Sequence, residues 1–349
     1  MIKLGIIGFG GIGHYHATNL IKRVDGIEVG GVFDIDPDRI EEAEKLGLRT
    51  YRTREEILGD PQIDIVLVST PNDVHAPIAL DAISAGKNVM LEKPAAMSAA
   101  EFVCIKQAAD SAGVFLTVHQ NRRFDKDFLI AGNVVSSGAL GEIFSIESKV
   151  WGCNGIPPGW RTQKRNGGGM LFDWGVHLID QMLLLVPEKI AHIYCDMHRF
   201  DGSDADDCFK LIIKFDSGKT ALIDIGTKNF QPAPRWLISG TSGAMVINDW
   251  SCSGSVITAK STDVYFEQEI VYTAAGPTKT MAPRNKLTLS ENPLPDVIAN
   301  GTEFYTNLVA ALCHNQRPVV CHDEVIRVLR VIDAAFLSSE SGKTIALDL

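Results

Sequence analysis

The sequence predicts an α/β protein built from two parts. The first part is expected to contain a doubly wound parallel sheet, and the second an α+β domain with a large open, mainly antiparallel sheet. Three observations lead to this expectation: a glycine-rich turn at residues 8–13, an alternation of apolar runs with amphipathic segments up to about residue 120, and consecutive apolar runs without intervening helices thereafter. With 349 residues, the chain is also long for a single hydrophobic core.

The glycine-rich turn follows the first expected strand, Lys3–Gly8, and leads into a helix expected over Gly13–Arg23. Gly8 permits the tight turn, Gly10 lets the backbone approach a phosphate, and Gly13 lets the helix lie against the strand. The first helical turn then offers free N–H groups to an anion. The sequence therefore predicts a Rossmann domain that binds the pyrophosphate of a dinucleotide through Gly8, Phe9, Gly10, Gly11, Ile12 and Gly13.

An acidic residue, Asp34, ends the second expected strand, 21 residues beyond Gly13. In a Rossmann domain this position delivers a carboxylate to the adenosine ribose, where it accepts hydrogen bonds from both hydroxyls. The same carboxylate repels a 2′-phosphate, and the next residue, Ile35, carries no positive charge. These features favour NAD as the cofactor over NADP.

The rest of the first domain alternates strands with helices, which is typical of a parallel sheet covered on both faces. Ile78, Ala82 and Ile83 repeat at helical spacing, and Gly86 is expected to end that helix. The expected strands are Glu28–Asp34, Asp64–Ser69, Asn88–Leu91 and Val114–Val118, and the expected helices are Pro37–Leu46, Val74–Ala85 and Ala99–Ala112.

The pattern changes after about Gln120, so we expect a dinucleotide-binding domain over residues 1–121 and an α+β substrate-binding and oligomerisation domain over 122–349. The expected helices of the second domain are Lys126–Ser136, Glu303–His314 and Asp323–Ser338, with an irregular loop at Pro277–Pro295. Its expected strands are Glu142–Trp151, Ala191–Met197, Phe209–Phe215, Lys219–Thr227, Trp236–Gly240, Ala244–Asn248, Ser255–Ala259 and Val264–Tyr272. The free face of such a sheet suggests a homodimer or homotetramer.

Composition narrows the class of protein. The longest apolar runs, such as Met182–Val186, are far shorter than the ~20 residues that span a bilayer, so no membrane role is expected. A formal net charge of −10 disfavours a nucleic-acid partner. The seven cysteines are scattered and show no CxxC spacing, which is typical of reduced thiols. Met1 is followed at once by the first strand, and we expect a cytoplasmic protein.

The tripeptide Glu92-Lys93-Pro94 follows an expected strand at the carboxyl edge of the sheet, where open α/β sheets bind ligands. Pro94 restricts the backbone of Lys93. An ammonium held at this edge can hydrogen-bond a substrate hydroxyl and stabilise alkoxide character as hydride leaves the carbon. An ordinary solvated lysine is the alternative interpretation.

A second motif runs from Gly167 to Asp180 and places three glycines before an amphipathic helix. Asp173 and His177 are four residues apart and are therefore expected on one helix face. A histidine there can accept the proton of an alcohol, and the carboxylate can orient it or bind a neighbouring hydroxyl. Two alternatives remain open: a core histidine paired with an aspartate, and a metal site formed by Asp173, His177 and Asp180. We expect no metal.

These motifs together resemble the Gfo/Idh/MocA family of NAD(P)-dependent sugar and cyclitol dehydrogenases. They follow in order along nearly the whole chain: Gly8–Gly13, Ser69–Asn72 with His75, Glu92–Pro94, Trp160–Arg161 and Gly168–Asp180. The resemblance implies a Rossmann domain followed by an α/β domain whose open sheet often makes the oligomer contact. It also implies a catalytic set of Lys93, Asp173 and His177, with His177 as proton acceptor and Lys93 as its electrostatic partner.

Further site residues follow from the resemblance. The cofactor set gains Thr70, Pro71, Asn72, His75, Glu92 and Lys93, and the substrate set comprises Lys93, Asn121, Arg122, Trp160, Arg161, Asp173 and His177. Arg123 lies beside this set. Trp174 departs from the family pattern because it is bulky where many relatives carry a smaller apolar residue, and this leaves the identity of the substrate open.

We therefore expect an NAD-dependent dehydrogenase that oxidises a secondary alcohol of a sugar, glycoside or cyclitol. Two alternatives stay open. One is a glycosidase that retains its NAD and uses transient oxidation to eliminate an aglycone, although such family members often show a Tyr and a different His spacing after the glycines. The other is a dinucleotide-binding sensor without catalysis, because a Rossmann domain alone proves no reaction.

Overall fold

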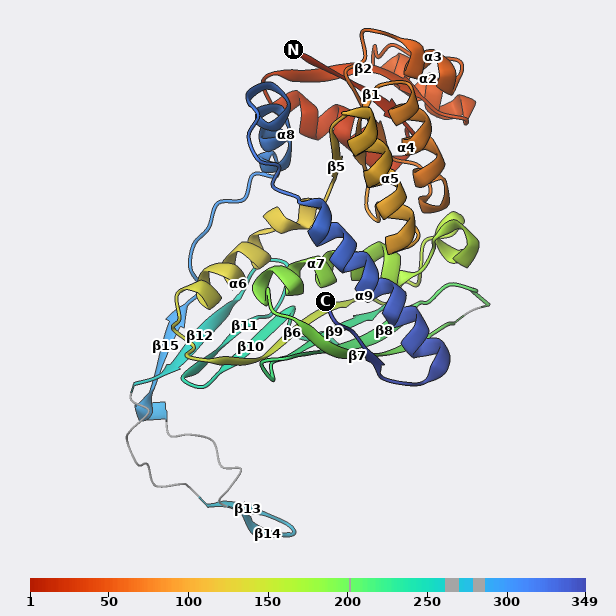
Figure 1. Cartoon of the computed structure of the whole chain (residues 1–349). Coiled ribbons are helices and arrows are strands. Elements are labelled where there is room, and N and C mark those ends of the chain that lie inside the picture. The colour runs from red at the N-terminus through yellow and green to blue at the C-terminus, as the bar shows by residue number, and fades with distance from the viewer. Residues whose placement is uncertain (201, 261–269, 279–285) are drawn as a thin grey trace.

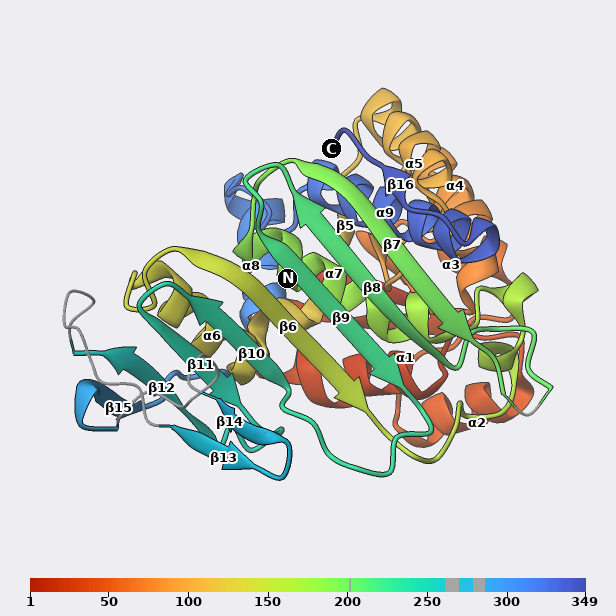
Figure 2. The same cartoon turned by 90° about the horizontal axis from the view of Figure 1, so that it is seen from below.

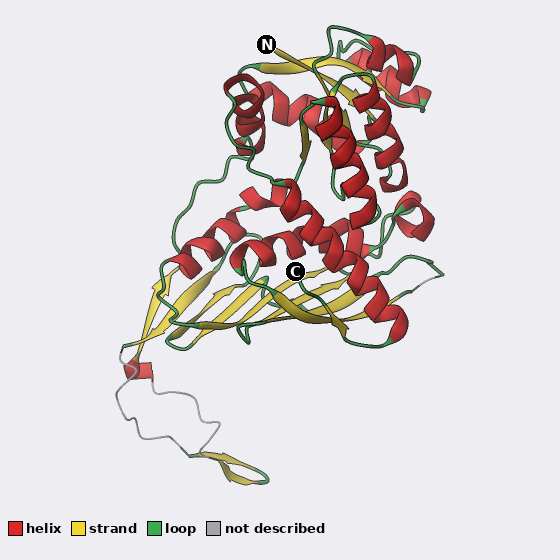
Figure 3. Cartoon of the chain, in the orientation of Figure 1, coloured by secondary structure: helices red, strands yellow, loops and turns green. Residues whose placement is uncertain are grey.

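The computed structural model describes residues 1–200, 202–260, 270–278 and 286–349. Figure 1 shows the first domain above a second, larger sheet, with helices α6 (Lys126–Ser136), α7 (Val176–Leu185) and α9 (His322–Ser341) layered between them. Figure 3 shows the same arrangement, with the strands of the larger sheet below this helical layer. Within the described ranges no helix is both long enough and apolar enough to cross a membrane.

The first sheet has the strand order β2-β1-β3-β4-β5, and all its neighbouring strands are parallel. Its central strands are unbroken buried apolar runs, as a sheet covered on both faces requires. The doubly wound parallel sheet is therefore confirmed. The strands are β1 (Ile2–Ile7), β2 (Ile27–Phe33), β3 (Ile65–Val68), β4 (Asn88–Leu91) and β5 (Leu116–Val118), and the helices are α2 (Pro37–Lys45), α3 (Arg54–Gly59), α4 (His75–Ser84) and α5 (Ala99–Ala112).

The first helix is less regular than expected. Helix α1 (Gly11–Tyr15) begins two residues before Gly13, a π-helical turn follows at His16–Leu20, and a 3₁₀ turn ends the segment at Ile21–Arg23. The π turn begins at His16, whose buried ring is hydrogen-bonded to residues distant in sequence. The apolar spacing of residues 11–23 predicts an ordinary α-helix, because it depends only on neighbours in the sequence and not on the distant partners of His16.

The second sheet has the strand order β15-β12-β11-β10-β6-β9-β8-β7-β16. Neighbouring strands are antiparallel except for the central pair β6 and β9, which is parallel. Helix α7 and the β7–β8 hairpin lie between β6 and β9 in the sequence and provide the long connection that a parallel pair requires. The predicted open, mainly antiparallel sheet is confirmed. Its strands are β6 (Ile143–Trp151), β7 (Ile190–His198), β8 (Cys208–Phe215), β9 (Thr220–Gly226), β10 (Trp236–Gly240), β11 (Gly243–Ile247), β12 (Gly254–Ala259), β15 (Leu289–Pro293) and β16 (Ile345–Ala346).

The irregular loop predicted at Pro277–Pro295 is partly wrong, because β15 lies within it and pairs with β12 at the sheet edge. The predicted strand at Val264–Tyr272 falls mostly outside the described residues. Its last two residues belong to β13 (Val271–Thr273), which forms a hairpin with β14 (Gly276–Thr278).

The face of the large sheet opposite the helices is uncovered by any helix in Figure 2. Register places one row of side chains across this face, from Tyr194 through Ile212 and Leu222 to Leu237 and beyond. Tyr194 and Ile212 are both exposed, although their neighbours along the strands are buried. The row is mainly apolar but includes Glu147, which lies between Leu222 and Leu237, and of its members Tyr194 and Ile212 are exposed.

The C-terminal segment returns to the first domain. Helix α8 (Glu303–His314) lies beside it in Figure 1, and the Tyr305 hydroxyl is 2.6 Å from Nδ1 of His16. Helix α9 also reaches this domain, since Asp333 accepts a hydrogen bond from the backbone N–H of Ala99 at 3.0 Å. The predicted division at residue 121 is therefore crossed by contacts from both helices.

Candidate active site

A cavity of about 970 Å³ opens at the carboxyl ends of β1, β2 and β3, where an open α/β sheet binds its ligand. Trp160, Arg161 and Asn166 of the second domain form part of its wall, so both domains contribute. Of the residues predicted for the cofactor, those lining this cavity are Gly8, Gly10, Gly11, Ile12, Asp34, Thr70 and Pro71.

The glycine turn has the shape that a pyrophosphate requires. Gly8 has a φ of +94°, and a Cβ there would lie 2.6 Å from the carbonyl oxygen of Ser69. A Cβ at Gly13 would overlap the carbonyl oxygen of Gly8, whereas Gly10 and Gly11 face open space. Gly8 and Gly13 therefore serve the packing of the turn, and Gly10 and Gly11 leave room beside the helix N-terminus for a phosphate.

Asp34 is held at the wall of this cavity by the glycine turn itself. Its Oδ2 accepts the backbone N–H of Phe9 at 2.5 Å, and its Oδ1 accepts that of Asp36 at 2.8 Å. The ring of Phe9 is fully buried, so Phe9 reaches the site only through its backbone. The donor set thus fits a dinucleotide, with anion space at the turn and a fixed carboxylate beside it.

Three arginines that the sequence reasoning did not single out also line the cavity. Arg39 pairs with Glu42 at 3.0 Å and Arg54 pairs with Asp81 at 2.8 Å, and Arg52 is the third. The sequence argument about NAD and NADP considered only Ile35, the residue that follows Asp34. These three arginines come later in the sequence, and the fold brings them to the same cavity as Asp34.

Lys93 connects the two domains. It follows β4, and its Nζ donates to the backbone carbonyl of Asp173 at 2.9 Å and to Oδ1 of the same residue at 3.1 Å. Burial raises the pKa of the Asp173 carboxyl, but Lys93 and Arg161 outweigh burial and hold that pKa below its usual range. The carboxylate is therefore ionised at neutral pH and keeps the ammonium in place.

His177 lies in the first turn of α7 and only 4% of its surface is exposed. Burial, followed by the positive charges of Lys93 and Arg122, lowers the pKa of its imidazole well below the usual value. Its Nδ1 has no hydrogen-bond partner among the described residues. A ring that is kept neutral is what a proton acceptor requires.

Asp173 and His177 do not form the pair that their spacing suggested. Asp173 lies in a π-helical turn, Leu171–Gly175, directly before α7, and its carboxylate bonds Lys93. In the part of the chain that the structure describes, no hydrogen bond joins Asp173 to His177. The alternative of a core histidine satisfied by an aspartate therefore does not describe His177.

Asp180 is not available to a metal together with Asp173 and His177. Both of its oxygens accept from Arg123, Nε to Oδ2 at 2.7 Å and Nη2 to Oδ1 at 2.5 Å, and the two side chains are buried. Arg123 also donates to Glu324 in α9 at 2.7 Å. This bidentate pair holds the start of the second domain against α7.

Replacing Arg123 with methionine is expected to lower the free energy of unfolding by roughly 3–5 kcal/mol, because it leaves the Asp180 carboxylate buried and unpaired. Denaturant unfolding of the protein without dinucleotide measures this loss. Arg39→Met, which breaks the exposed pair with Glu42, is the matched control and should leave stability unchanged within error. An equal loss in both variants would contradict a special role for the buried pair.

Glu92 was predicted to contact the cofactor, but its carboxylate is instead buried in a hydrogen-bonded network. Its Oε1 is 2.7 Å from Nε2 of His16 and 2.6 Å from Nδ1 of His119, and its Oε2 accepts the backbone N–H of Lys93 at 3.0 Å. Burial raises the pKa of Glu92, but His119 and His16 outweigh it and hold that pKa well below its usual range. Through this last hydrogen bond, the buried network holds the backbone of Lys93 in position.

This network is also a group that could hold a metal ion by proximity alone. Ligands of a tetrahedral zinc ion lie about 3.3 Å apart, given metal–nitrogen bonds near 2.0 Å. The nitrogens of His16 and His119 lie closer than this to Glu92 Oε1, at 2.7 and 2.6 Å, and both form a hydrogen bond with it. The cluster is thus occupied by its own hydrogen bonds.

Two other residues predicted for the cofactor brace the site without lining its cavity. His75 is fully buried, with Nδ1 2.9 Å from the carbonyl of Pro94 and Nε2 3.0 Å from that of Thr70. The amide of Asn72 donates to the carbonyl of Gly167 at 2.7 Å and so joins the two domains. His75 thereby connects the turn that contains Thr70 with the turn that contains Lys93 and Pro94.

The residues predicted for the substrate form aromatic and cationic pairs. The Arg122 guanidinium lies 4.0 Å from the ring centre of Trp174, and that of Arg161 lies 4.5 Å from Trp160. Asn121 has a buried side-chain oxygen with no partner among the described residues. Sequence reasoning missed Trp250, which is 55% exposed and lies 5.7 Å from Trp174 between ring centres. The sequence feature that could have indicated a binding role for Trp250 is the presence of a large aromatic residue in an expected turn.

A smaller cavity of about 240 Å³ lies beside Asp173 and Trp174 and is also lined by the ends of β6 and β9. At roughly 30 Å³ per water in the liquid, its volume corresponds to about eight waters. It is therefore large enough for one small ring and lies next to the carboxylate that holds Lys93.

Comparison with protein families agrees with this geometry. Residues 2–120 match the family described as "Oxidoreductase family, NAD-binding Rossmann fold", and residues 128–246 match the "GFO/IDH/MocA C-terminal domain". The chain belongs to the Gfo/Idh/MocA family of oxidoreductases. The resemblance seen in the sequence motifs is confirmed.

Similar proteins match all or a large part of this chain. The scyllo-inositol 2-dehydrogenase (NADP(+)) IolW of Bacillus subtilis is 29% identical over 99% of this chain and 96% of its own length. The myo-inositol 2-dehydrogenase of Thermotoga maritima is 29% identical over 64% of this chain and 68% of its own. A crystal structure of an NAD-binding protein from Listeria innocua has a TM-score of 0.95 at 40% identity and covers 99% of both chains.

Proposed function

We propose that this oxidoreductase is an NAD-dependent dehydrogenase that oxidises a secondary alcohol of a sugar, glycoside or cyclitol. One observation supports this proposal above the others. The ammonium of Lys93 and the buried, neutral ring of His177 come from different domains to the same site, and Asp173 holds the ammonium there. This is the pairing of an electrostatic stabiliser with a proton acceptor that alcohol oxidation requires.

Bound in the larger cavity, NAD would supply the hydride acceptor. The glycine turn and Asp34 would hold its pyrophosphate and ribose, and Thr70 and Pro71 would line its path toward Lys93. The chain's own chemistry concerns the proton: His177 accepts it from the substrate hydroxyl, while Lys93 hydrogen-bonds the same oxygen and stabilises its developing negative charge. Asp173 keeps the Lys93 side chain in place.

The substrate class is supported by the relatives named as inositol dehydrogenases and by the ring-sized cavity beside Asp173. Trp174, Trp250 and Arg122 border this region and offer apolar faces and hydrogen-bond donors to a polyol. A polyol, glycoside or sugar offers both an apolar C–H face to the aromatic rings and hydroxyl oxygens that accept hydrogen bonds.

A turnover screen tests the proposal directly. Inositols, hexoses, polyols and glycosides are incubated with NAD and NADP in parallel, and reduced nicotinamide is followed by absorbance. Net reduction of NAD by an alcohol of this class is the expected result. Release of a free aglycone without net reduction would indicate a redox-assisted glycosidase, and dinucleotide binding without any turnover would indicate a sensor.

The choice of NAD over NADP is proposed from Asp34. Replacing Asp34 with serine is expected to weaken NAD binding about tenfold, which is roughly 1.4 kcal/mol, and to strengthen NADP binding. Loss of the carboxylate removes two ribose hydrogen bonds and the repulsion of a 2′-phosphate, while the nearby Arg39 and Arg52 remain. Titration of both dinucleotides by fluorescence measures the change.

The control for this cofactor test is Asp38→Ser, which removes an exposed carboxylate of α2 that does not line the cavity. It should leave both dissociation constants unchanged. Equal changes for NAD and NADP in Asp34→Ser would show that Asp34 does not discriminate at the 2′ position.

We also propose a homodimer or homotetramer formed through the uncovered sheet face. The adjacent exposed side chains of Tyr194 and Ile212 support this, because exposed apolar groups on a sheet face without covering helices are typical of interaction sites. A cytoplasmic location is supported by the seven cysteines, all of which are free thiols.

A further inference from the structure

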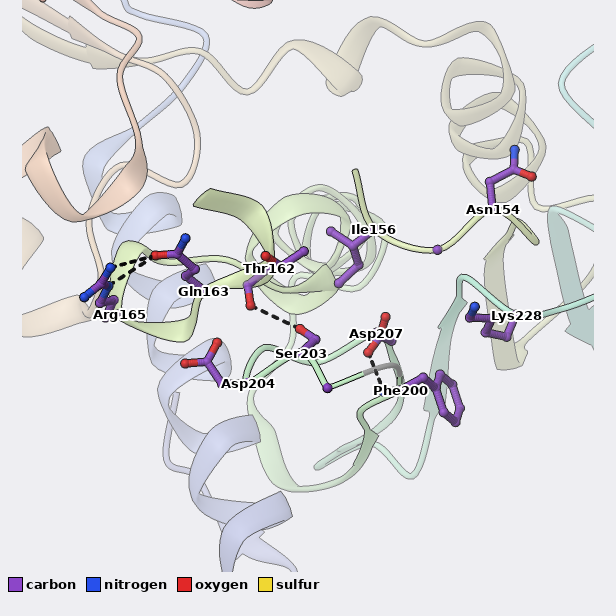
Figure 4. A pocket seen from close by; sticks show the side chains of 12 residues that line it. Asn154, Ile156, Thr162, Gln163, Arg165, Phe200, Ser203, Asp204, Asp207 and Lys228 are labelled. Atoms are coloured by element: carbon purple, nitrogen blue, oxygen red, sulfur yellow. Dashed lines mark hydrogen bonds between the residues drawn. The ribbon is translucent and has the colours of Figure 1, made fainter. Parts of the chain in front are cut away.

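A third cavity, of about 700 Å³, lies next to the ring-sized cavity and is not used by the proposed reaction. Figure 4 shows its side chains, which come from the segment 154–165, from the β7–β8 connection around Phe200 and Asp207, and from Lys228 after β9. It is almost three times as large as the cavity beside Asp173.

The large outer cavity and the ring-sized cavity share a wall. Asn154 and Gly155 line both, and Thr162 and Gln163 of the outer cavity directly follow Trp160 and Arg161, which line the cofactor cavity. A molecule that reacts beside Asp173 could therefore extend past Asn154 into the outer cavity.

The walls of the outer cavity are tied to the catalytic segment. Asp206 accepts the backbone N–H of Leu171 at 2.7 Å, and its carbonyl accepts that of Met170 at 2.9 Å. The Ser203 hydroxyl donates to the carbonyl of Thr162 at 3.1 Å, which closes the β7–β8 connection onto the other wall (Figure 4). The β7–β8 connection, which forms one wall of the outer cavity, is thus hydrogen-bonded to Met170 and Leu171, which shortly precede Asp173.

The lining combines one aromatic face with many neutral polar groups. Phe200 is 37% exposed and stacks on His198 with an angle of 4° between the ring planes. The amides of Asn154 and Gln163 and the hydroxyls of Thr162 and Ser203 line the same cavity. An aromatic face suits the apolar side of a pyranose ring, and amides and hydroxyls can both donate to and accept from its hydroxyls.

The charges of the lining argue against an anionic ligand. Arg165 and Lys228 are balanced by Asp204 and Asp207. Arg165 also donates to Gln163 at 3.1 Å, and Asp207 accepts the backbone N–H of Phe200 at 2.6 Å. The lining therefore offers no excess of positive charge to a phosphate or a carboxylate.

We propose that the outer cavity is a glycosyl subsite, so that the substrate is a neutral glycoside whose second sugar unit lies against Phe200 while its reacting ring lies beside Asp173. This inference rests on the proposed function and narrows its substrate class. A free monosaccharide or cyclitol fills only the ring-sized cavity and forgoes the contacts of the outer one.

Matched substrate pairs test the subsite. Glucose is compared with maltose and cellobiose, and myo-inositol with a galactosyl-inositol, in the wild type, in Phe200→Ala and in Phe230→Ala. Phe230 is an exposed phenylalanine that lines none of the three cavities and is the matched control. The wild type should favour one glycoside over its parent ring by at least about tenfold in kcat/KM, and Phe200→Ala should abolish that preference without changing turnover of the parent ring.

Direct binding separates this inference from the proposed function. The same pairs are titrated by calorimetry onto the protein with NAD present. Glycoside binding that Phe200→Ala weakens would support the subsite even if no probe is oxidised, in which case only the proposed function fails. Oxidation of free rings with no gain from the second sugar would overturn the subsite and leave the function standing. Absence of glycoside binding, or tighter binding of glucuronate or glucose 6-phosphate, would also overturn it.

Discussion

Replacing His177 with alanine is expected to lower kcat by roughly 100-fold or more while NAD still binds. The proposed reaction needs a group that takes the hydroxyl proton near neutral pH, and His177 is buried, neutral and unbonded at Nδ1. The variant removes this acceptor, and His177 is not among the residues that line the cofactor cavity. Steady-state kinetics on a substrate from the turnover screen, together with fluorescence titration of NAD, measure the two effects.

Two further variants make the His177 test specific. His177→Asn preserves a polar side chain of similar size but cannot accept a proton near neutral pH, and it should lose as much activity as the alanine variant. His192→Ala removes an exposed histidine of β7 and should keep full turnover. Wild-type kcat in His177→Ala, with the fold intact by circular dichroism, would show that another group accepts the proton.

Replacing Lys93 with methionine is expected to lower kcat by a similar factor of roughly 100 or more. Methionine keeps the length and the apolar stem of the side chain but removes the ammonium that bonds Asp173 and would stabilise the substrate oxygen. Lys106→Met, which breaks an exposed pair with Asp110 on α5, is the control and should retain activity. Undiminished kcat in Lys93→Met would remove Lys93 from the reaction.

The pH profile of Lys93→Met provides a second readout. In the wild type, burial and then the charge of Lys93 hold the pKa of His177 well below its usual value, so the base form persists into mildly acidic solution. Loss of the positive charge favours the imidazolium and raises this pKa. The acidic limb of kcat/KM should therefore move to higher pH in Lys93→Met, and a shift to lower pH would contradict the charge coupling.

The sequence predicts the first domain well because its signals are local. The glycine turn and the buried runs of β3 and β4 follow from single segments. By contrast, β15 contains Ser290, Glu291 and Asn292 and shows no apolar alternation; it is a strand because the edge of β12 supplies its hydrogen bonds. The π turn at His16 likewise depends on partners that are distant along the chain.

The candidate site divides in the same way. Lys93 and Asp173 were predicted from separate motifs, and the fold brings them within 3.1 Å of each other. Glu92 and His75 lie in the same motifs, but motif membership cannot distinguish a residue that would touch the cofactor from one that holds the turn in place. Trp250 was missed because it lies in the turn after β11 and becomes part of the site only when that turn meets Trp174.

The return of α8 to the first domain limits how this protein can be divided. Residues 1–121 expressed alone would lack Tyr305, the partner of the buried His16, and would expose the surface that α8 and α9 cover. The dinucleotide-binding half is thus completed by helices α8 and α9, which follow strands β6 to β15 in the sequence. A chimera that transfers this half into a relative would need to carry residues 303–314 with it, and a truncation before them should yield an aggregating product instead of a smaller NAD-binding protein.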